Sequence, residues 1–142
     1  MHIHIINGPN LNLLGKRQVQ IYGNQSFEDY YAKLQKQYPL VQFSCFQDNS
    51  EGKLIDNVQE MGYQAQGIIL NAAAYSHTSV ALADAVAAVP APVIEVHISN
   101  VFARETHRHH SFLSPLAKGI IAGFGLDSYR LAVEAIMLLH ND

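Results

Sequence analysis

Five short segments of the chain are rich in apolar and β-branched residues, as β-strands are. Four of the five are almost continuously apolar, which is typical of strands covered on both faces of a sheet. One of them reads simply GIIL. We therefore predict five strands, over residues 2–6, 41–46, 67–70, 92–98 and 119–124.

Helical patterns, with apolar residues three and four positions apart, lie between these strands. Ser26 and Asp29 have the spacing of a capping box at the start of the first pattern. Gly62 is expected to end the second, and Asp127 is expected to cap the last. The predicted helices cover residues 26–38, 50–63, 79–89 and 127–139.

Strand and helix thus alternate along the whole chain, and parallel strands require such crossovers. The pattern predicts an α/β fold: a three-layer sandwich with a five-stranded parallel sheet, formed by a single domain over residues 1–142. In sheets of this kind ligands bind beyond the carboxyl ends of the strands. The segments after the first, third and fourth strands are crowded with Asn, His, Arg and Ser, so a site is expected there.

Composition and charge narrow the classes of partner. The chain has 142 residues and a net charge of −3, with no stripe of Lys or Arg, so no nucleic-acid partner is expected. The N-terminal segment lacks a basic region, and its apolar run is too short for a signal peptide or a membrane span. We therefore expect a cytoplasmic protein without membrane association. Cys45, the only cysteine, lies in an apolar run and is predicted to be a small core residue.

Phosphate-binding and metal-binding motifs do not fit. Gly8 and Gly15 lie too far apart for a P-loop, and Ser128 stands where a dinucleotide-binding loop needs its third glycine. The histidines within 107–110 lack a helical i, i+4 pair and lie among cations, which disfavours a bound dication. A structural or pH-sensitive role is favoured for them, and we assign no metal.

The segment EVHISN carries a more specific signal. Glu95 and His97 alternate along one strand, so both point to the same face near its carboxyl end. There the carboxylate can orient the imidazole and keep it protonated, which makes His97 a general acid or a substrate clamp. A strand-end histidine with only a structural hydrogen bond is the alternative. Backbone N–H groups around Ile98 and Ser99 offer a nest for an anion such as a carboxylate.

Other polar residues are predicted to converge on the same edge of the sheet. Asn71 and His77 follow the third strand, and Arg108 follows the fourth. Each alone is explained by turn chemistry or by a surface charge. Their convergence at one edge favours a binding or catalytic site.

Several longer motifs together resemble one enzyme family. NGPNLNLLG, QIYG, IEVHISN and RHHSFLSP occur in the order and spacing of type II 3-dehydroquinate dehydratases, and the likeness covers nearly the whole chain. The resemblance implies a flavodoxin-like fold and no cofactor. It also implies reversible dehydration of 3-dehydroquinate to 3-dehydroshikimate by anti elimination through an enolate. A homo-dodecamer, a tetramer of trimers, is the expected assembly.

The resemblance also implies the residues of the site. In this chain the catalytic positions are Tyr22 as base, His97 as acid, Arg17, Asn10 and Glu95. Asp84 corresponds to a residue that approaches the site from a neighbouring subunit. The other substrate-binding positions are Asn71, His77, Ile98, Ser99 and Arg108, with Arg104 at a supporting polar position.

A tyrosinate base suits removal of a proton next to a ketone, because it is intrinsically strong. Ionising a phenol near pH 7 rather than near 10 requires roughly 4 kcal/mol of preference for the anion. A close guanidinium in a desolvated site can supply much of it, and Arg17 is expected to do so. The segment 15–23, bounded by glycines, is then expected to act as a lid. It carries Gln18 and Val19 where the family usually has glutamate and proline, so closure is expected to cost more.

Two other classes remain as alternatives. A flavodoxin-like module that binds FMN or accepts a phosphoryl group shares the predicted fold, but a receiver needs acidic residues after the first strand, where this chain has NGPN. The type I dehydratase mechanism needs a Schiff-base lysine, and the five lysines lie in polar or loop segments. The reaction serves both aromatic biosynthesis and quinate breakdown, and the sequence favours neither.

Overall fold

A computed structural model describes residues 1–141 and contains the predicted five-stranded sheet. All neighbouring strands pair in parallel, in the order β2-β1-β3-β4-β5, which is the flavodoxin-like order. The predicted fold class is therefore confirmed. The strands are β1 (His2–Asn7), β2 (Gln42–Gln47), β3 (Gly67–Asn71), β4 (Val93–His97) and β5 (Gly119–Ala122).

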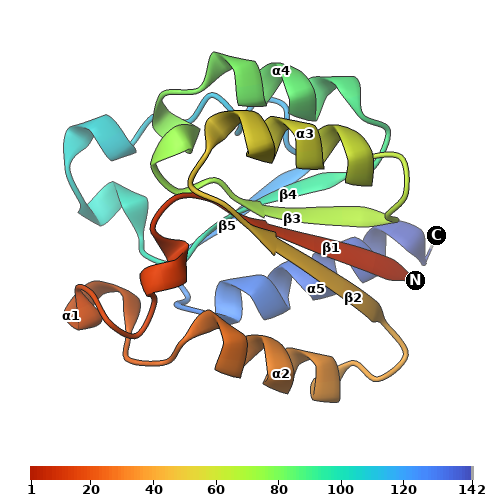
Figure 1. The fold of residues 1–142 in the computed structure, drawn as a ribbon, viewed down its shortest axis with the longest axis horizontal. Coiled ribbons are helices and arrows are strands. Elements are labelled where there is room, and N and C mark those ends of the chain that lie inside the picture. Colours follow the sequence, from red (N-terminus) through yellow and green to blue (C-terminus); the bar gives the residue numbers. More distant parts are fainter. Residues whose placement is uncertain (142) are drawn as a thin grey trace.

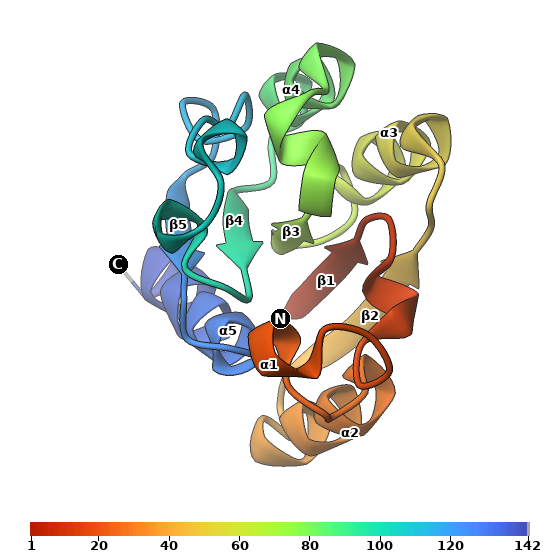
Figure 2. The same cartoon turned by 90° about the vertical axis from the view of Figure 1, so that its left-hand side faces the viewer.

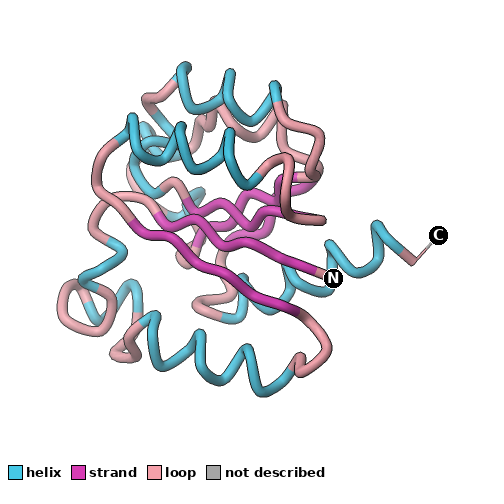
Figure 3. The backbone as a smooth tube through the Cα atoms, turned by 45° about the vertical axis from the view of Figure 1, so that its right-hand side comes forward, coloured by secondary structure: helices cyan, strands magenta, loops and turns pink. Residues whose placement is uncertain are grey.

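Four longer helices of the described residues cover the two faces of the sheet, two on each face, as can be followed in Figure 1. The tube in Figure 3 shows the strands as the middle layer of this sandwich. On one face lie α2 (Phe27–Gln37) and α5 (Asp127–His140), and on the other lie α3 (Glu51–Met61) and α4 (Val80–Ala88). The short helix α1 (Val19–Tyr22) and four 3₁₀ turns occupy the connections after the strands. Among residues 1–141, no helix is long and apolar enough to cross a membrane.

Each face of the sheet has its own apolar core, because successive side chains of a strand point to opposite faces. Ile5 and Ile69 pack with α2 and α5, whereas Ile6 and Leu70 pack with α3 and α4. The central strands β1, β3 and β4 are buried almost throughout. The edge strands are not, and Cys45 on β2 is exposed, so its predicted core position is wrong.

The ends of the helices agree only in part with the predictions. Ser26 caps α2 as expected, since its hydroxyl accepts from the backbone N–H of Asp29. Gly62 ends α3 in a right-handed conformation, and it must be glycine because an added Cβ would lie 2.3 Å from the Cβ of Val89. Asp127 does not cap α5: it is the first helical residue, and its carboxylate accepts from the Tyr30 hydroxyl instead.

The carboxyl ends of the strands face the viewer in Figure 2, surrounded by α1 and the connections that follow β1, β3 and β4. The sequence motifs singled out above lie in these connections. The fold therefore gathers them at one end of the molecule.

Candidate active site

A cavity of about 120 Å³ opens at this end of the sheet. Its walls come from the segments after β1, β3 and β4 and from the segment 15–23, hereafter the lid segment. Among the predicted site residues, those that line the cavity are Asn10, Arg17, Tyr22, Asn71, His77, His97, Ile98, Ser99 and Arg108, together with Arg104.

The predicted acid pair lies at the end of β4. His97 and Glu95 are both buried, and His97 Nε2 lies 3.0 Å from Glu95 Oε2. Because an ionised carboxylate only accepts hydrogen bonds, Nε2 donates to it. The other ring nitrogen, Nδ1, is then the one available for chemistry in the cavity that His97 lines.

Two serines complete the surroundings of Glu95. The Ser111 hydroxyl donates to Oε1 over 2.6 Å, and the Ser114 hydroxyl donates to Oε2 over 2.8 Å. Burial by itself would raise the pKa of Glu95, but hydrogen bonds from His97 and the serines outweigh it and lower the pKa. Glu95 therefore stays ionised inside the protein. These serines stand in the motif RHHSFLSP, but sequence reasoning gave them no role.

The predicted base lies on the opposite, lid side of the cavity. Arg104 donates from Nη1 to the Tyr22 hydroxyl over 2.7 Å and also to Ser99 Oγ over 3.3 Å. Arg17 lies over the face of the Tyr22 ring, with its guanidinium carbon 5.2 Å from the ring centroid. Arg17 and Tyr22 are thus neighbours, as the sequence suggested, but the cation in contact with the hydroxyl is Arg104.

The lid segment contains a single helical turn between two glycines with positive φ. Gly15 has φ 87° and Gly23 has φ 83°, a region that favours glycine. Gln18, which precedes the turn, has φ 44°, so an ordinary side chain occupies a sparsely populated conformation there. Tyr22 is the last residue of the turn, and the conformation of this segment therefore sets the position of its hydroxyl.

The other side of the cavity is built from the segments after β1 and β3. Gly8 allows these segments to approach closely, because an added Cβ would lie 2.5 Å from the carbonyl oxygen of Ala72. Asn71 donates from Nδ2 to the Tyr129 hydroxyl over 2.9 Å. Asn10, at φ 70°, lies at the turn after β1, where its backbone N–H donates to Asn49.

His77 packs against the acid pair. Its ring stacks on that of His97 with centroids 6.0 Å apart, and its Nδ1 donates to the carbonyl oxygen of His110 over 2.7 Å. Burial lowers the pKa of His77, and the nearby His97 and Arg108 lower it further. His77 is thus favoured in its neutral form, with Nε2 as a hydrogen-bond acceptor.

Two predicted residues need separate mention. Arg108 lines the cavity and is held by Glu105, with Nε 2.8 Å from Oε2. Asp84 is exposed on α4 and is not among the residues that line the cavity of its own chain. Within residues 1–141, no three potential ligands gather into a metal-binding group.

Taken together, the fold and the cavity define a flavodoxin-like α/β protein with acid–base groups at the carboxyl ends of a parallel sheet. A receiver domain from Pseudomonas aeruginosa, 8% identical with a TM-score of 0.54 over 96% of each chain, shares this fold.

Comparison with known proteins shows that the chain belongs to the class II dehydroquinase family. The family model described as "Dehydroquinase class II" matches residues 1–137. The 3-dehydroquinate dehydratase of Synechococcus sp. (strain CC9605) is 48% identical over 96% of this chain and 95% of its own. That of Exiguobacterium sp. (strain ATCC BAA-1283 / AT1b) is 50% identical over 96% and 94%.

Solved structures agree with this assignment. The type II dehydroquinase of Butyrivibrio crossotus is 42% identical with a TM-score of 0.93, over 96% of this chain and 97% of that one. The type II dehydroquinase of Propionibacterium acnes is 39% identical with a TM-score of 0.89, over 99% and 97%. The resemblance drawn from the motifs is thus confirmed.

Proposed function

We propose that this chain, a 3-dehydroquinate dehydratase of type II, works by anti elimination through an enolate, with Tyr22 as base and His97 as acid. The observation that carries the mechanism is that two separate groups of polar side chains line one cavity. A tyrosine hydroxyl contacts arginine on one side, and a histidine contacts a buried carboxylate on the other.

The first step removes the proton at C2, next to the ketone. Tyrosinate takes this proton, and the electrons of the C–H bond pass into the enolate. Arg104 at the hydroxyl and Arg17 over the ring place two positive charges beside the phenol that takes the proton. Asn10, which lines the same cavity, would stabilise the enolate oxygen directly or through a water.

The second step breaks the C1–oxygen bond. The enolate collapses to the ketone, a C1–C2 double bond forms, and the departing hydroxyl takes a proton from His97 to leave as water. Protonated His97 donates from Nε2 to Glu95, so its Nδ1–H supplies this proton. Glu95, kept ionised by Ser111 and Ser114, stabilises the imidazolium before the transfer.

The remaining residues hold the substrate so that both of its reacting ends are aligned. Backbone N–H groups at Ile98 and Ser99 would bind the carboxylate, with Arg104 beside Ser99 adding positive charge. Asn71, His77 and Arg108 would contact the hydroxyl groups from the walls of the cavity. Fixing the ring at several points lowers the entropic part of the barrier. No cofactor enters this mechanism.

The assembly and location are also proposed from the family. We expect a homo-dodecamer, a tetramer of trimers, in the cytoplasm, with Asp84 reaching the cavity of a neighbouring subunit. Its exposed position on α4, outside its own cavity, supports this arrangement. A native mass of twelve chains would agree, whereas an active monomer would contradict it and leave Asp84 without a role.

The experiment for the activity is to mix the purified protein with 3-dehydroquinate and follow ultraviolet absorbance, since the product is a conjugated enone. A steady rise is expected. Borohydride added with substrate should leave the enzyme active, because no lysine Schiff base forms. Absence of any rise from folded protein, or inactivation by borohydride, would contradict the proposal.

A further inference from the structure

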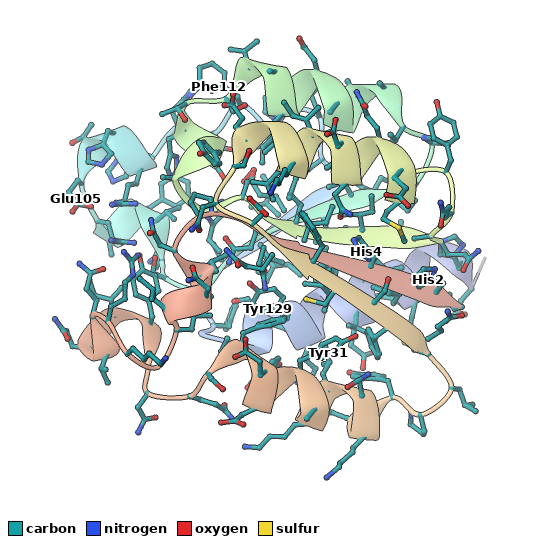
Figure 4. All side chains as sticks on the ribbon, viewed as in Figure 1. His2, His4, Tyr31, Glu105, Phe112 and Tyr129 are labelled. Atoms are coloured by element: carbon teal, nitrogen blue, oxygen red, sulfur yellow. The ribbon has the colours of Figure 1, made fainter. Side chains whose placement is uncertain are left out.

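A hydrogen-bond network borders the cavity, and two of its three residues have no part in the mechanism. Asn7 and Asn71 are register partners at the carboxyl ends of β1 and β3, and both are buried. The hydroxyl of Tyr129, on α5, donates to Asn7 Oδ1 over 2.7 Å and accepts from Asn71 Nδ2 over 2.9 Å. Figure 4 labels Tyr129, in the layer between the sheet and its helices.

These contacts permit only one orientation of the Asn71 amide. Its Oδ1 accepts from the backbone N–H of Ala73 over 3.2 Å, so a flipped amide would place two donors against each other. The flipped carbonyl would also need the single Tyr129 proton, which is already donated to Asn7. Nδ2 carries two hydrogens, and Tyr129 uses one. The other is available to the cavity that Asn71 lines.

The location of the network indicates a purpose beyond stability. Tyr129 is completely buried in an apolar cluster with Phe27, Ile5 and Ile69, where burying a polar group costs free energy unless it is paired. Asn7 Nδ2 has no hydrogen-bond partner among the described residues, so the pairing is incomplete. Both asparagines directly precede segments that line the cavity.

The Asn71 side chain also supports a strained backbone. Ala73 has φ 52°, an uncommon conformation for a residue with a Cβ. Its backbone N–H donates to the Asn71 side chain, which thereby supports this conformation. Ala73 itself lines the cavity. An amide held firmly by Tyr129 therefore fixes both a donor and a stretch of the cavity wall. Burial raises the pKa of Tyr129, so its hydroxyl stays protonated and donates its hydrogen bond to Asn7.

We infer that Tyr129 is a positioning residue for substrate binding: its buried hydroxyl holds the Asn71 amide so that the free N–H of Nδ2 is directed to a substrate oxygen. This inference rests on the proposed role of Asn71 as a substrate-binding residue. Tyr129 does not itself line the cavity. Its effect on the reaction passes through Asn71.

The test is Tyr129→Phe, which removes the hydroxyl and keeps the ring. Loss of one oriented hydrogen bond is expected to raise the KM for 3-dehydroquinate roughly tenfold, with kcat changed less than about twofold. The matched control is Tyr30→Phe. Tyr30 lies in the same cluster, with its ring centroid 6.4 Å from that of Tyr129, but its hydroxyl donates to Asp127, away from the cavity. Tyr30→Phe should leave KM unchanged.

A double-mutant cycle separates positioning from simple packing. In an Asn71→Ala background, Tyr129→Phe should raise KM no further, because the group through which it acts is gone. Independent effects in the cycle, or an unchanged KM in Tyr129→Phe, would overturn the inference.

A second readout does not depend on turnover. Hydrogen exchange of the Asn71 side-chain amide, followed by NMR, should be faster in Tyr129→Phe than in the wild type or Tyr30→Phe. Equal exchange in all three would overturn the inference. A wild-type protein with protected Asn71 amide hydrogens but no dehydratase activity would contradict the proposed function and leave the positioning supported.

Discussion

The side of the cavity with the proposed acid and the side with the proposed base, hereafter the acid side and the base side, are built in different ways. Glu95 and His97 belong to a buried central strand, and three neighbouring side chains fix the carboxylate. Tyr22 belongs to the lid segment at the surface, where its ring packs against the edge of a core cluster and contacts two arginine side chains. The proposed acid is therefore held by the fold, whereas the proposed base depends on the position of the lid segment.

This difference has a consequence for catalysis. A group fixed by the core keeps its geometry whether or not substrate is bound, while a group on a segment bounded by glycines can move with closure. Changes on the acid side are thus expected to alter proton transfer and stability together. Changes on the base side are expected to alter turnover with little effect on the free energy of unfolding.

The largest effect is expected for Tyr22→Phe. Without the phenol oxygen no base reaches C2, and kcat should fall by about 10³-fold or more, while urea unfolding stays unchanged. Tyr31→Phe is the control, because Tyr31 packs against the core and lies outside the cavity. A Tyr22→Phe variant that keeps most of its kcat would remove this residue from the role of base.

Glu95→Gln is expected to come next. The neutral glutamine amide cannot stabilise a positive His97 ring. Its N–H₂ group would also face His97 and the serines, which donate to the carboxylate in the wild type. We therefore expect kcat to fall about 10²-fold or more. Unlike Tyr22→Phe, Glu95→Gln should also lower the free energy of unfolding. Turnover and unfolding are measured on the same preparation. Loss of turnover without any loss of stability would contradict the distinction between the two sides.

The two arginines are expected to differ. Arg104→Lys breaks the contact with the Tyr22 hydroxyl and should lower kcat about 100-fold, whereas Arg17→Lys, at the ring face, should lower it about tenfold. Steady-state kinetics across pH would compare them. A larger loss for Arg17→Lys would assign it the main electrostatic role, as the sequence alone had suggested.

The smallest effect is expected for Ser114→Ala. Glu95 has a lowered pKa in the folded protein, so its ionised form adds stability above its ordinary value of 4.5, and this is lost as pH falls through the lowered pKa. Removing Ser114 should raise the pKa of Glu95 in the folded protein. The free energy of unfolding should then be lower above pH 4.5, and its decrease at acid pH should begin at a higher pH than in the wild type. Urea unfolding followed from pH 7 down to well below pH 4 measures this.

Ser76→Ala is the matched control for that measurement. The Ser76 hydroxyl is buried but has no hydrogen-bond partner among the described residues, so its removal breaks no such contact. Its stability curve should keep the shape of the wild-type curve. If the two serine variants show the same pH dependence, the hydroxyl of Ser114 does not act through Glu95.

The sequence was most informative where structure is local. Glu95 and His97 could be paired correctly because alternation along a strand fixes which face each side chain takes. Cys45 was misplaced because an edge strand depends on strand order, and an alternating pattern of strands and helices does not specify that order. Asp127 was misjudged because its carboxylate interacts with Tyr30, which lies 97 residues away.

The site shows the same limit. The contact between Arg104 and Tyr22 joins residues 82 positions apart, and it depends on how two surface segments meet. Ser111 and Ser114 lie in one of the motifs singled out above, and their hydroxyls contact Glu95. Their segment is irregular, so no periodic pattern in the sequence could predict that contact. Tyr129 received no prediction, since nothing in its own segment shows the two asparagines it contacts.

The most direct test of separate base and acid groups is exchange of the C2 proton of 3-dehydroquinate in deuterated water, followed by NMR. His97→Ala should still incorporate deuterium while forming little product, because Tyr22 can make the enolate without the acid. Tyr22→Phe should do neither. Exchange that persists in Tyr22→Phe and disappears in His97→Ala would contradict the mechanism and reverse the two roles.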